Sequence, residues 1–212
     1  PDPVMHTPFT SITYREVSFT VRIRDPARHH MTNRLILSPC SGHFHAGRMV
    51  AIMGPSGCGK STLLDILANK KTTPYAGEVY LNGHPRDERF SRVTAYVPQV
   101  DVMPTYWRVG EAIRFNQMLK QQRPSRVSAA QQDKLVDAML RDLGLESVQD
   151  TIIGSETVRG ISGGQRRRVT LARGLITGAC AVFCDEPTSG LSSTDAETCV
   201  RHMKLLVRKH GL

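Results

Sequence analysis

The chain has 212 residues, a length that suits one well-packed domain with room for a smaller lobe. Apolar residues make up 40% of it and charged residues 22%, as in an ordinary globular protein. No apolar run approaches the roughly 20 residues of a membrane-spanning helix, which excludes such a span. A net charge of +9 would suit nucleic acid, anionic lipid or polyphosphate. Because its arginines are dispersed, we interpret the charge as a solvated basic surface and expect no nucleic-acid partner.

The chain ends and the cysteines bear on its origin. Residues 1–10 are polar and proline-rich, unlike a signal peptide. The chain lacks an initiator Met and ends directly after a predicted helix, so we expect a C-terminally truncated piece of a longer protein. Five cysteines without a Cys-x-x-Cys pair favour a reduced, intracellular compartment. We expect most of them to be small core residues.

Strands dominate the first part of the chain. Residues 11–23 are rich in β-branched and aromatic side chains, which predicts a strand, and a loop is expected at 24–33. A short strand at 35–37 should be followed by a turn at Ser41-Gly42. Residues 77–83 read as a strand that ends in an Asn-Gly turn. We therefore expect an antiparallel β layer here.

The stretch from Gly54 to Ser61 fits the phosphate-binding pattern Gly-x-x-x-x-Gly-Lys-Ser/Thr. An apolar run at 49–53 should be a strand before it, and residues 60–70 should be a helix after it. Glycines let successive N–H groups converge on a phosphate, and the helix N-terminus adds partial positive charge. Such a pattern should arise by chance in roughly one chain in a hundred of this length. The sequence therefore predicts a nucleoside triphosphate bound at Gly54, Pro55, Ser56, Gly57, Cys58, Gly59, Lys60, Ser61 and Thr62.

Three of these residues have individual predicted roles. Lys60 should reach the β- and γ-phosphates, and the Ser61 hydroxyl should bind Mg²⁺. Cys58 lies among backbone amides at a helix N-terminus, which should favour its thiolate and make it reactive. The alternative for Cys58 is an inert, buried cysteine.

Helices dominate the rest of the chain. Periodicity predicts helices at 109–122, 128–143, 165–176 and 194–209, the second with Ser128 as N-cap and Gly144 as its stop. Strands are expected at 93–97 and 181–184. We therefore expect a helical lobe inserted between Gln99 and about Thr157.

Two adjacent carboxylates, Asp185 and Glu186, follow the apolar strand at 181–184. In phosphate-loop NTPases the first such carboxylate helps to hold Mg²⁺. Glu186 is then in position to activate a water molecule as general base. Gln99 also follows a strand, and its amide oxygen suits Mg²⁺ and the attacking water. The alternative for the two acids, simple capping of a strand, is weakened by the phosphate loop.

Residues 161–165 read Ile-Ser-Gly-Gly-Gln and open a predicted helix, which makes a second anion-binding N-terminus. This stretch resembles the signature motif of ATP-binding cassette (ABC) proteins. The longer stretches 158–169, 185–191 and 96–101 are similar to the G subfamily, a group of sterol, pigment-precursor and multidrug exporters. The resemblance covers almost the whole chain.

The resemblance implies an α/β phosphate-loop NTPase of ABC type: a RecA-like core, an N-terminal antiparallel β layer and an inserted helical subdomain. One nucleotide-binding domain would consist of residues 1–98, 99–164 and 165–212. ATP and Mg²⁺ would be its ligands. Lys60, Gln99 and Glu186 would be catalytic, and Ser61, Gln99 and Asp185 would bind the metal.

The resemblance also implies partners and a location. A second nucleotide-binding domain would pack head to tail, so that the signature residues Ser162, Gly163, Gly164 and Gln165 reach its ATP. A transmembrane domain of the same polypeptide would lie outside this chain. The domain would work at the cytoplasmic face of an integral membrane exporter.

The sequence departs from the family pattern in several places. Ser192 stands where the family has an Asp, although Asp195 is close, and Gln165 stands where the G subfamily usually has Glu. Tyr14 and Phe19 are the candidates for stacking on adenine, but Val21 stands where that aromatic is most expected. The family's switch histidine should lie beyond Leu212, and His210 comes too early to replace it.

Two rival functions are weighed. An ABC ATPase that acts on ribosomes or RNA is compatible with the net charge of +9. The G-like motifs argue against it. A non-catalytic regulatory half is favoured weakly by Ser192 and opposed by the intact Lys60, Asp185 and Glu186.

Overall fold

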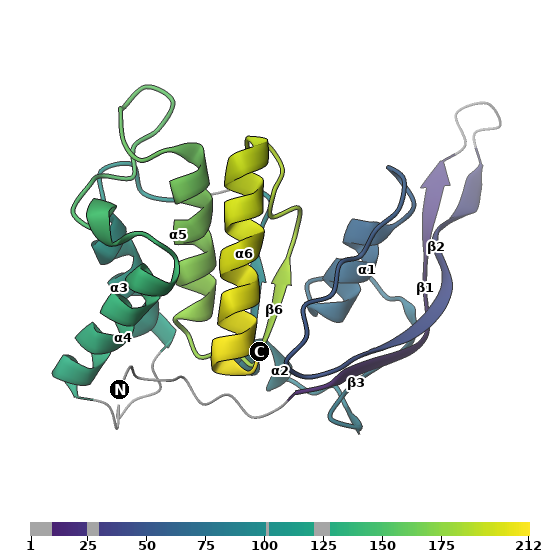
Figure 1. Ribbon diagram of the computed structural model, residues 1–212. Helices are drawn as coiled ribbons and strands as arrows, with labels where there is room; N and C mark the ends of the chain where they lie inside the picture. Colours follow the sequence, from purple (N-terminus) through teal and green to yellow (C-terminus); the bar gives the residue numbers. More distant parts are fainter. Residues whose placement is uncertain (1–9, 25–29, 101, 121–127) are drawn as a thin grey trace.

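The computed structural model describes residues 10–24, 30–100, 102–120 and 128–212. The end of the helix expected at 109–122 lies outside the described residues. Figure 1 shows two parts: an antiparallel sheet with one helix against it, and a group of longer helices around a short parallel strand pair.

The antiparallel sheet has the strand order β2-β1-β3-β4, formed by β1 (Ile12–Arg24), β2 (Met31–Phe44), β3 (Ala76–Leu81) and β4 (His84–Pro85). Strand β1 is paired on both edges: its first residue, Ile12, lies opposite Phe44 of β2 and opposite Leu81 of β3. Asn82 and Gly83 both have positive φ, at 50° and 80°, as the predicted Asn-Gly hairpin turn requires. The expected antiparallel β layer is therefore present.

Two predictions in this layer were wrong. The second strand begins at Met31, inside the expected loop, and it runs without interruption through the expected turn at Ser41-Gly42. The reason is its partner, because β1 offers a ladder along its whole length from Ile12 to Arg24. Gly42 does not make a turn. It leaves room for the Tyr14 side chain, because a Cβ at this position would lie 2.5 Å from the Tyr14 hydroxyl.

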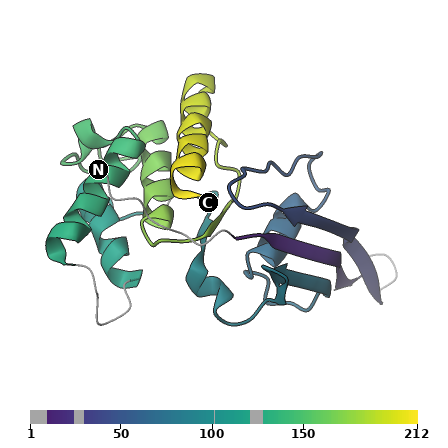
Figure 2. The ribbon, with the colours of Figure 1, turned by 60° about the horizontal axis from the view of Figure 1, so that its bottom comes forward.

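Helix α1 (Lys60–Leu67) packs on this sheet, and Figure 2 shows it lying beside the strands. It ends three residues before the predicted Lys70. Ile66, Leu67 and Val17 are fully buried between helix and sheet, and Phe90 of the short helix α2 (Phe90–Val93) joins the same core. An apolar face on α1 thus fixes the helix that begins at the phosphate-loop pattern.

The second part contains α3 (Val109–Lys120), α4 (Ala129–Asp142), α5 (Gly163–Leu175), α6 (Ser193–His210) and the 3-10 turn η1 (Glu146–Val148). Strands β5 (Thr94–Val97) and β6 (Ala181–Cys184) pair in parallel. Helix α5 contacts α3, β5 and α6, and its apolar side chains lie in one core with those of α3 and α4. Ser128 caps α4 together with Gln131, and Gly144 follows its end at φ 61°, both as predicted.

The predicted strand at 49–53 is absent. This segment has no regular secondary structure and pairs with no strand, and Met53 is 87% exposed. Among the described residues, β6 pairs with β5 alone. Apolar residues give a segment only a preference for the strand state, whereas a strand also needs a neighbour within about 4.8 Å.

No helix in the described part of the chain combines the length and the apolar character needed to cross a bilayer.

Candidate nucleotide-binding site

The phosphate loop depends on glycine at its junction with α1. Gly59 is the N-cap of the helix in the left-handed conformation, at φ 94°, and a Cβ there would lie 2.9 Å from the carbonyl oxygen of Ile36. Gly57 is also left-handed, at φ 78°. Since Gly59 has no side chain, it makes no side-chain cap for the first N–H groups of α1.

The Lys60 ammonium lies inside its own loop. Its Nζ donates to the carbonyl oxygens of Gly54 at 2.9 Å and Pro55 at 2.7 Å. Ser61 follows in the first turn of α1 and is exposed. In the predicted phosphate loop, N–H groups that converge beside this cation would make an anion cradle.

The carboxylates lie where two parallel strands end. Strand β5 leads to Gln99, and its neighbour β6 leads to Asp185 and Glu186. Gln99 Nε2 donates to Glu186 Oε2 at 2.6 Å. Glu186 is exposed and has a φ of 42°, a left-handed conformation that costs a residue with a side chain about 1–3 kcal/mol.

Asp185 is hydrogen-bonded by the side chain of Tyr96. The Tyr96 hydroxyl lies 3.1 Å from Asp65 Oδ1 and 3.3 Å from Asp185 Oδ2, so it bridges α1 and the end of β6. Burial, followed by the hydrogen bond to Asp65 and the charges of both carboxylates, raises the pKa of Tyr96 well above its ordinary value. The phenol therefore stays protonated, and its single hydrogen is shared between the two carboxylates or donated to one of them at a time.

Arg167 is a structural residue that sequence reasoning missed. It lies in α5, is 3% exposed, and donates to four backbone carbonyls: those of Pro98, Gln99, Asp185 and Pro187. One guanidinium thus fixes both strand ends that carry Gln99 and Glu186. The arginine run after the signature motif was the only sequence signal for it.

The signature residues form a closed cap. The Ser162 hydroxyl accepts from the Gln165 N–H at 3.2 Å, and the Gln165 side chain accepts from the Ser162 N–H at 2.9 Å. Gly164 packs against Asp195, because a Cβ there would lie 2.4 Å from the Asp195 carboxylate. Ser192 caps α6 by accepting from the Asp195 N–H at 3.1 Å, a role that suits Ser as well as Asp.

One groove connects the predicted residues. It has a volume of about 470 Å³, and Lys60, Ser61, Asp185 and Glu186 line it together with apolar side chains of residues 49–52, β6 and α6. Gln99 reaches this group through its bond to Glu186. The signature residues do not line the groove. The structure thus brings Lys60 and Ser61 into one groove with the two acids, whereas Gly54–Gly59, Thr62 and the signature residues do not line it.

Comparisons with known proteins agree with this geometry. The family model described as ABC transporter matches residues 37–189, a range that contains the phosphate loop, Gln99, the signature and both acids. The chain belongs to the ABC transporter family.

Several curated ABC transporters of the G family are similar to this family member. "ABC transporter G family member 1" of Dictyostelium discoideum is 35% identical over 199 residues, which is 92% of the chain and 25% of that protein. "ABC transporter G family member 6" of the same organism is 41% identical over 180 residues, or 83% of the chain and 12% of that protein. Mouse (Mus musculus) "Broad substrate specificity ATP-binding cassette transporter ABCG2" is 32% identical over 200 residues, which is 93% of the chain and 30% of that protein. The chain thus spans a third or less of each of these relatives.

The structure also bears on the predictions for Cys58, for the aromatic residues proposed to stack on adenine, and for His210. Cys58 is exposed, so the alternative of a buried cysteine was wrong, while its reactivity stays a prediction. Phe19 is only 3% exposed and lies under Lys71, which leaves no face for adenine. Tyr14 packs against Phe44 and Gly42. His210 is buried and lies 3.4 Å from Asp142 of α4.

Proposed function

We propose that this chain is the ATP-binding and ATP-hydrolysing domain of a G-type ABC exporter. Residues 1–98 and 165–212 would form its RecA-like core, and residues 99–164 its helical subdomain. The observation that carries the proposal is the 2.6 Å bond from Gln99 Nε2 to Glu186 Oε2 at the end of the groove that Lys60 lines. A cation cradle for phosphate and an exposed carboxylate beside an amide are the two parts that hydrolysis needs.

The residues of the groove fit ATP with Mg²⁺. Lys60 would exchange its two loop carbonyls for phosphate oxygens, and the N–H groups of residues 54–62 would complete the cradle. The Ser61 hydroxyl, the Gln99 amide and the Asp185 carboxylate are oxygen donors, which Mg²⁺ prefers. When bound, Mg²⁺ would neutralise charge on the β- and γ-phosphates.

Glu186 would act as general base. Its carboxylate is exposed, so it can accept a proton from a water molecule beside the γ-phosphate. Gln99 would orient that water and keep the carboxylate turned into the groove. Arg167 would be a positioning residue, because it donates to the backbone carbonyls of Gln99 and Asp185, next to these two side chains.

The signature would serve a second copy of the domain. Ser162 and Gly163 are exposed at the N-terminus of α5 and lie off the groove, which supports a role of Ser162–Gln165 toward ATP held by the partner domain. The transmembrane domain of the same polypeptide would convert closure of two such domains into export. The pair would work at the cytoplasmic face of the membrane.

Two variants separate binding from chemistry. Lys60→Ala should weaken Mg-ATP binding, because it removes the cation from the cradle. Glu186→Gln should bind Mg-ATP normally and lower turnover by about 10²–10⁴-fold, because the amide cannot accept the proton. Nucleotide titration of the chain and ATPase rates of the full-length protein measure the two effects.

Glu197→Gln is the matched control, since Glu197 is an exposed carboxylate on α6 that pairs with Arg201 and does not line the groove. It should leave both quantities unchanged. Hydrolysis at the normal rate by Glu186→Gln would disprove the assigned base, and unchanged affinity in Lys60→Ala would disprove the assigned cradle.

A further inference from the structure

The side chain of Tyr96 lies where three elements meet. Tyr96 belongs to β5, Asp65 belongs to α1, and Asp185 directly follows β6. The Tyr96 hydroxyl oxygen is 3.1 Å from Asp65 Oδ1 and 3.3 Å from Asp185 Oδ2. All three residues are partly buried. One phenol therefore connects the helix that follows the phosphate loop to the acid proposed to bind Mg²⁺.

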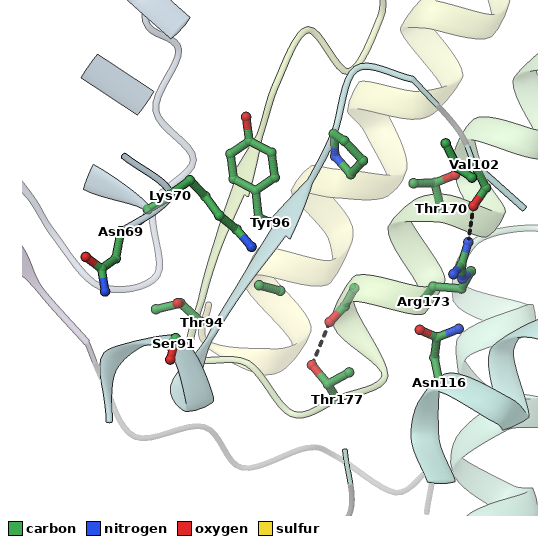
Figure 3. A pocket seen from close by; sticks show the side chains of 14 residues that line it. Asn69, Lys70, Ser91, Thr94, Tyr96, Val102, Asn116, Thr170, Arg173 and Thr177 are labelled. Carbon is green, nitrogen blue, oxygen red and sulfur yellow. Dashed lines mark hydrogen bonds between the residues drawn. The ribbon is translucent and has the colours of Figure 1, made fainter. Parts of the chain in front are cut away.

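The ring of Tyr96 is held independently of its hydroxyl group. Lys70 Nζ lies 5.6 Å from the centre of the ring, and Figure 3 shows the hydroxyl at the end of the ring away from this ammonium group. The backbone of Tyr96 lies opposite Phe183 in the parallel ladder of β5 and β6. A substitution that removes only the hydroxyl should therefore leave the ring in place.

The phenol has one hydrogen for two carboxylates. Both of its oxygen–oxygen distances exceed the usual value for an O–H···O bond, about 2.7–2.8 Å, which fits a shared hydrogen. Among the described residues, Tyr96 is the only side chain bonded to the Asp185 carboxylate. The bond uses Oδ2 and leaves Oδ1 for a ligand in the groove that Asp185 lines. The orientation of this carboxylate thus depends on one hydrogen, for which Asp65 competes.

We propose that Tyr96 is a positioning residue that orients the Asp185 carboxylate toward Mg²⁺ in the Mg-ATP complex. Carboxylates that bind metals are usually held by a hydrogen bond from a second group, and loss of that group typically lowers metal affinity or activity about 10–100-fold. This inference rests on the proposed function, because it requires that Asp185 bind the Mg²⁺ that accompanies ATP.

The test compares ATP binding to the 212-residue chain in excess Mg²⁺ and in EDTA, by calorimetry. The ratio of the two dissociation constants is the gain in affinity that the metal contributes. Tyr96→Phe should lower this gain about tenfold or more, because Asp185 loses its donor. Affinity in EDTA should stay unchanged, because the phosphate loop is intact. A merely structural role of Tyr96 would weaken binding in both media.

Three further variants locate the effect. Tyr80→Phe is the matched control, since this phenol also donates to a carboxylate, that of Glu78, and does not line the groove. It should keep the full gain from Mg²⁺. Asp65→Asn removes the competing charge and leaves the Tyr96 hydroxyl, so it should keep or increase the gain. Lys60→Ala should weaken ATP binding in both media.

Four results would overturn the inference. These are no gain from Mg²⁺ in the unchanged chain, the same gain in Tyr96→Phe, an equal loss of affinity in both media in Tyr96→Phe, and a lowered gain in Asp65→Asn. In each case, ATP binding that Lys60→Ala weakens would still support the proposed function. A chain that binds no ATP in either medium would overturn the proposed function, and this inference with it.

Discussion

Two helix N-termini of this molecule carry anion-binding motifs, and they are capped in opposite ways. Helix α1 begins at Gly59, a left-handed residue that makes no side-chain cap. Helix α5 begins at Ser162, whose side chain and that of Gln165 satisfy each other's backbone N–H. The first N–H groups of α1 therefore need an external partner, whereas α5 already satisfies part of its own.

This difference is compatible with the different tasks proposed for the two ends. An uncapped N-terminus with Lys60 inside its loop favours a permanent phosphate site. A capped N-terminus gains less from a phosphate, which suits a contact made only while two domains are closed. The predictions below test this contrast, from the largest expected effect to the smallest.

The largest effect concerns how α5 is held in place, independently of its cap. Arg167→Met should lower the free energy of unfolding by about 3 kcal/mol or more, because four carbonyls lose a charged donor and some remain buried. Denaturant unfolding measures it. Arg166→Met is the control on the same helix, since Arg166 bonds one carbonyl, that of Ile153. Equal losses in both variants would show that the arginine contacts do not fix α5.

Exchange of the glycines would test the contrast directly. Gly59→Ala should cost about 1–3 kcal/mol and weaken ATP binding, because its φ is 94° and Ile36 is in contact. Gly163→Ala in the first turn of α5 should be tolerated, since nothing lies within 4 Å of a Cβ there. Melting temperature and nucleotide affinity are the measurements. The contrast fails if Gly59→Ala melts and binds as the unchanged chain does.

The serine caps allow a matched pair. Ser162 and Ser128 both form a capping box with a Gln three residues later, and only Ser162 belongs to the signature. Replacement of either by Ala should cost about 1 kcal/mol of stability. Only Ser162→Ala should also lower the ATPase rate of the full-length protein beyond that loss. If both variants lowered the rate equally, the signature assignment would not stand.

The smallest expected effect is that of pH. It should change the free energy of unfolding through His210 of α6 and leave the two helix N-termini unaffected. Burial lowers the pKa of His210 below 6.5, although Asp142 partly opposes this shift. The unfolded chain therefore binds the proton more readily. Stability should be complete above about pH 7 and fall as the pH drops through 6.5 toward the lower folded pKa, by at most about 1.4 kcal/mol per pH unit.

Unfolding experiments from pH 7 to pH 5 measure this dependence. His210→Gln should flatten the slope, and the exposed His84→Gln should not. Lys209 and His202 also contact Asp142. His210→Gln and His84→Gln are therefore both compared with the unchanged chain at each pH, so that the slope can be ascribed to His210. An unchanged slope in His210→Gln would contradict the prediction.

Residues whose side-chain chemistry decides local structure could be predicted from the sequence. Ser128, Gly144 and the Asn82-Gly83 turn are examples. The hydrogen bond from Gln99 to Glu186 was not predicted, although both residues were expected to follow strands. Arg167 could not be predicted, because its partners are backbone carbonyls that every residue has. The prediction of a strand at 49–53 was wrong, because strand formation depends on a neighbouring strand and not on apolar side chains alone. The same dependence extended β2 through Ser41-Gly42.

The backbone of Glu186 exposes a conflict between folding and chemistry. A φ of 42° suits glycine or asparagine, yet glycine would remove the carboxylate and asparagine would supply only an amide. A protein selected for its melting temperature alone would not keep glutamate at this turn. The chain accepts local strain so that a carboxylate can stand at the mouth of the groove. Sequence optimisation that rewards stability would therefore tend to replace Glu186, just as it would replace Glu16 at φ 48°, and would produce a more stable protein without its proposed base.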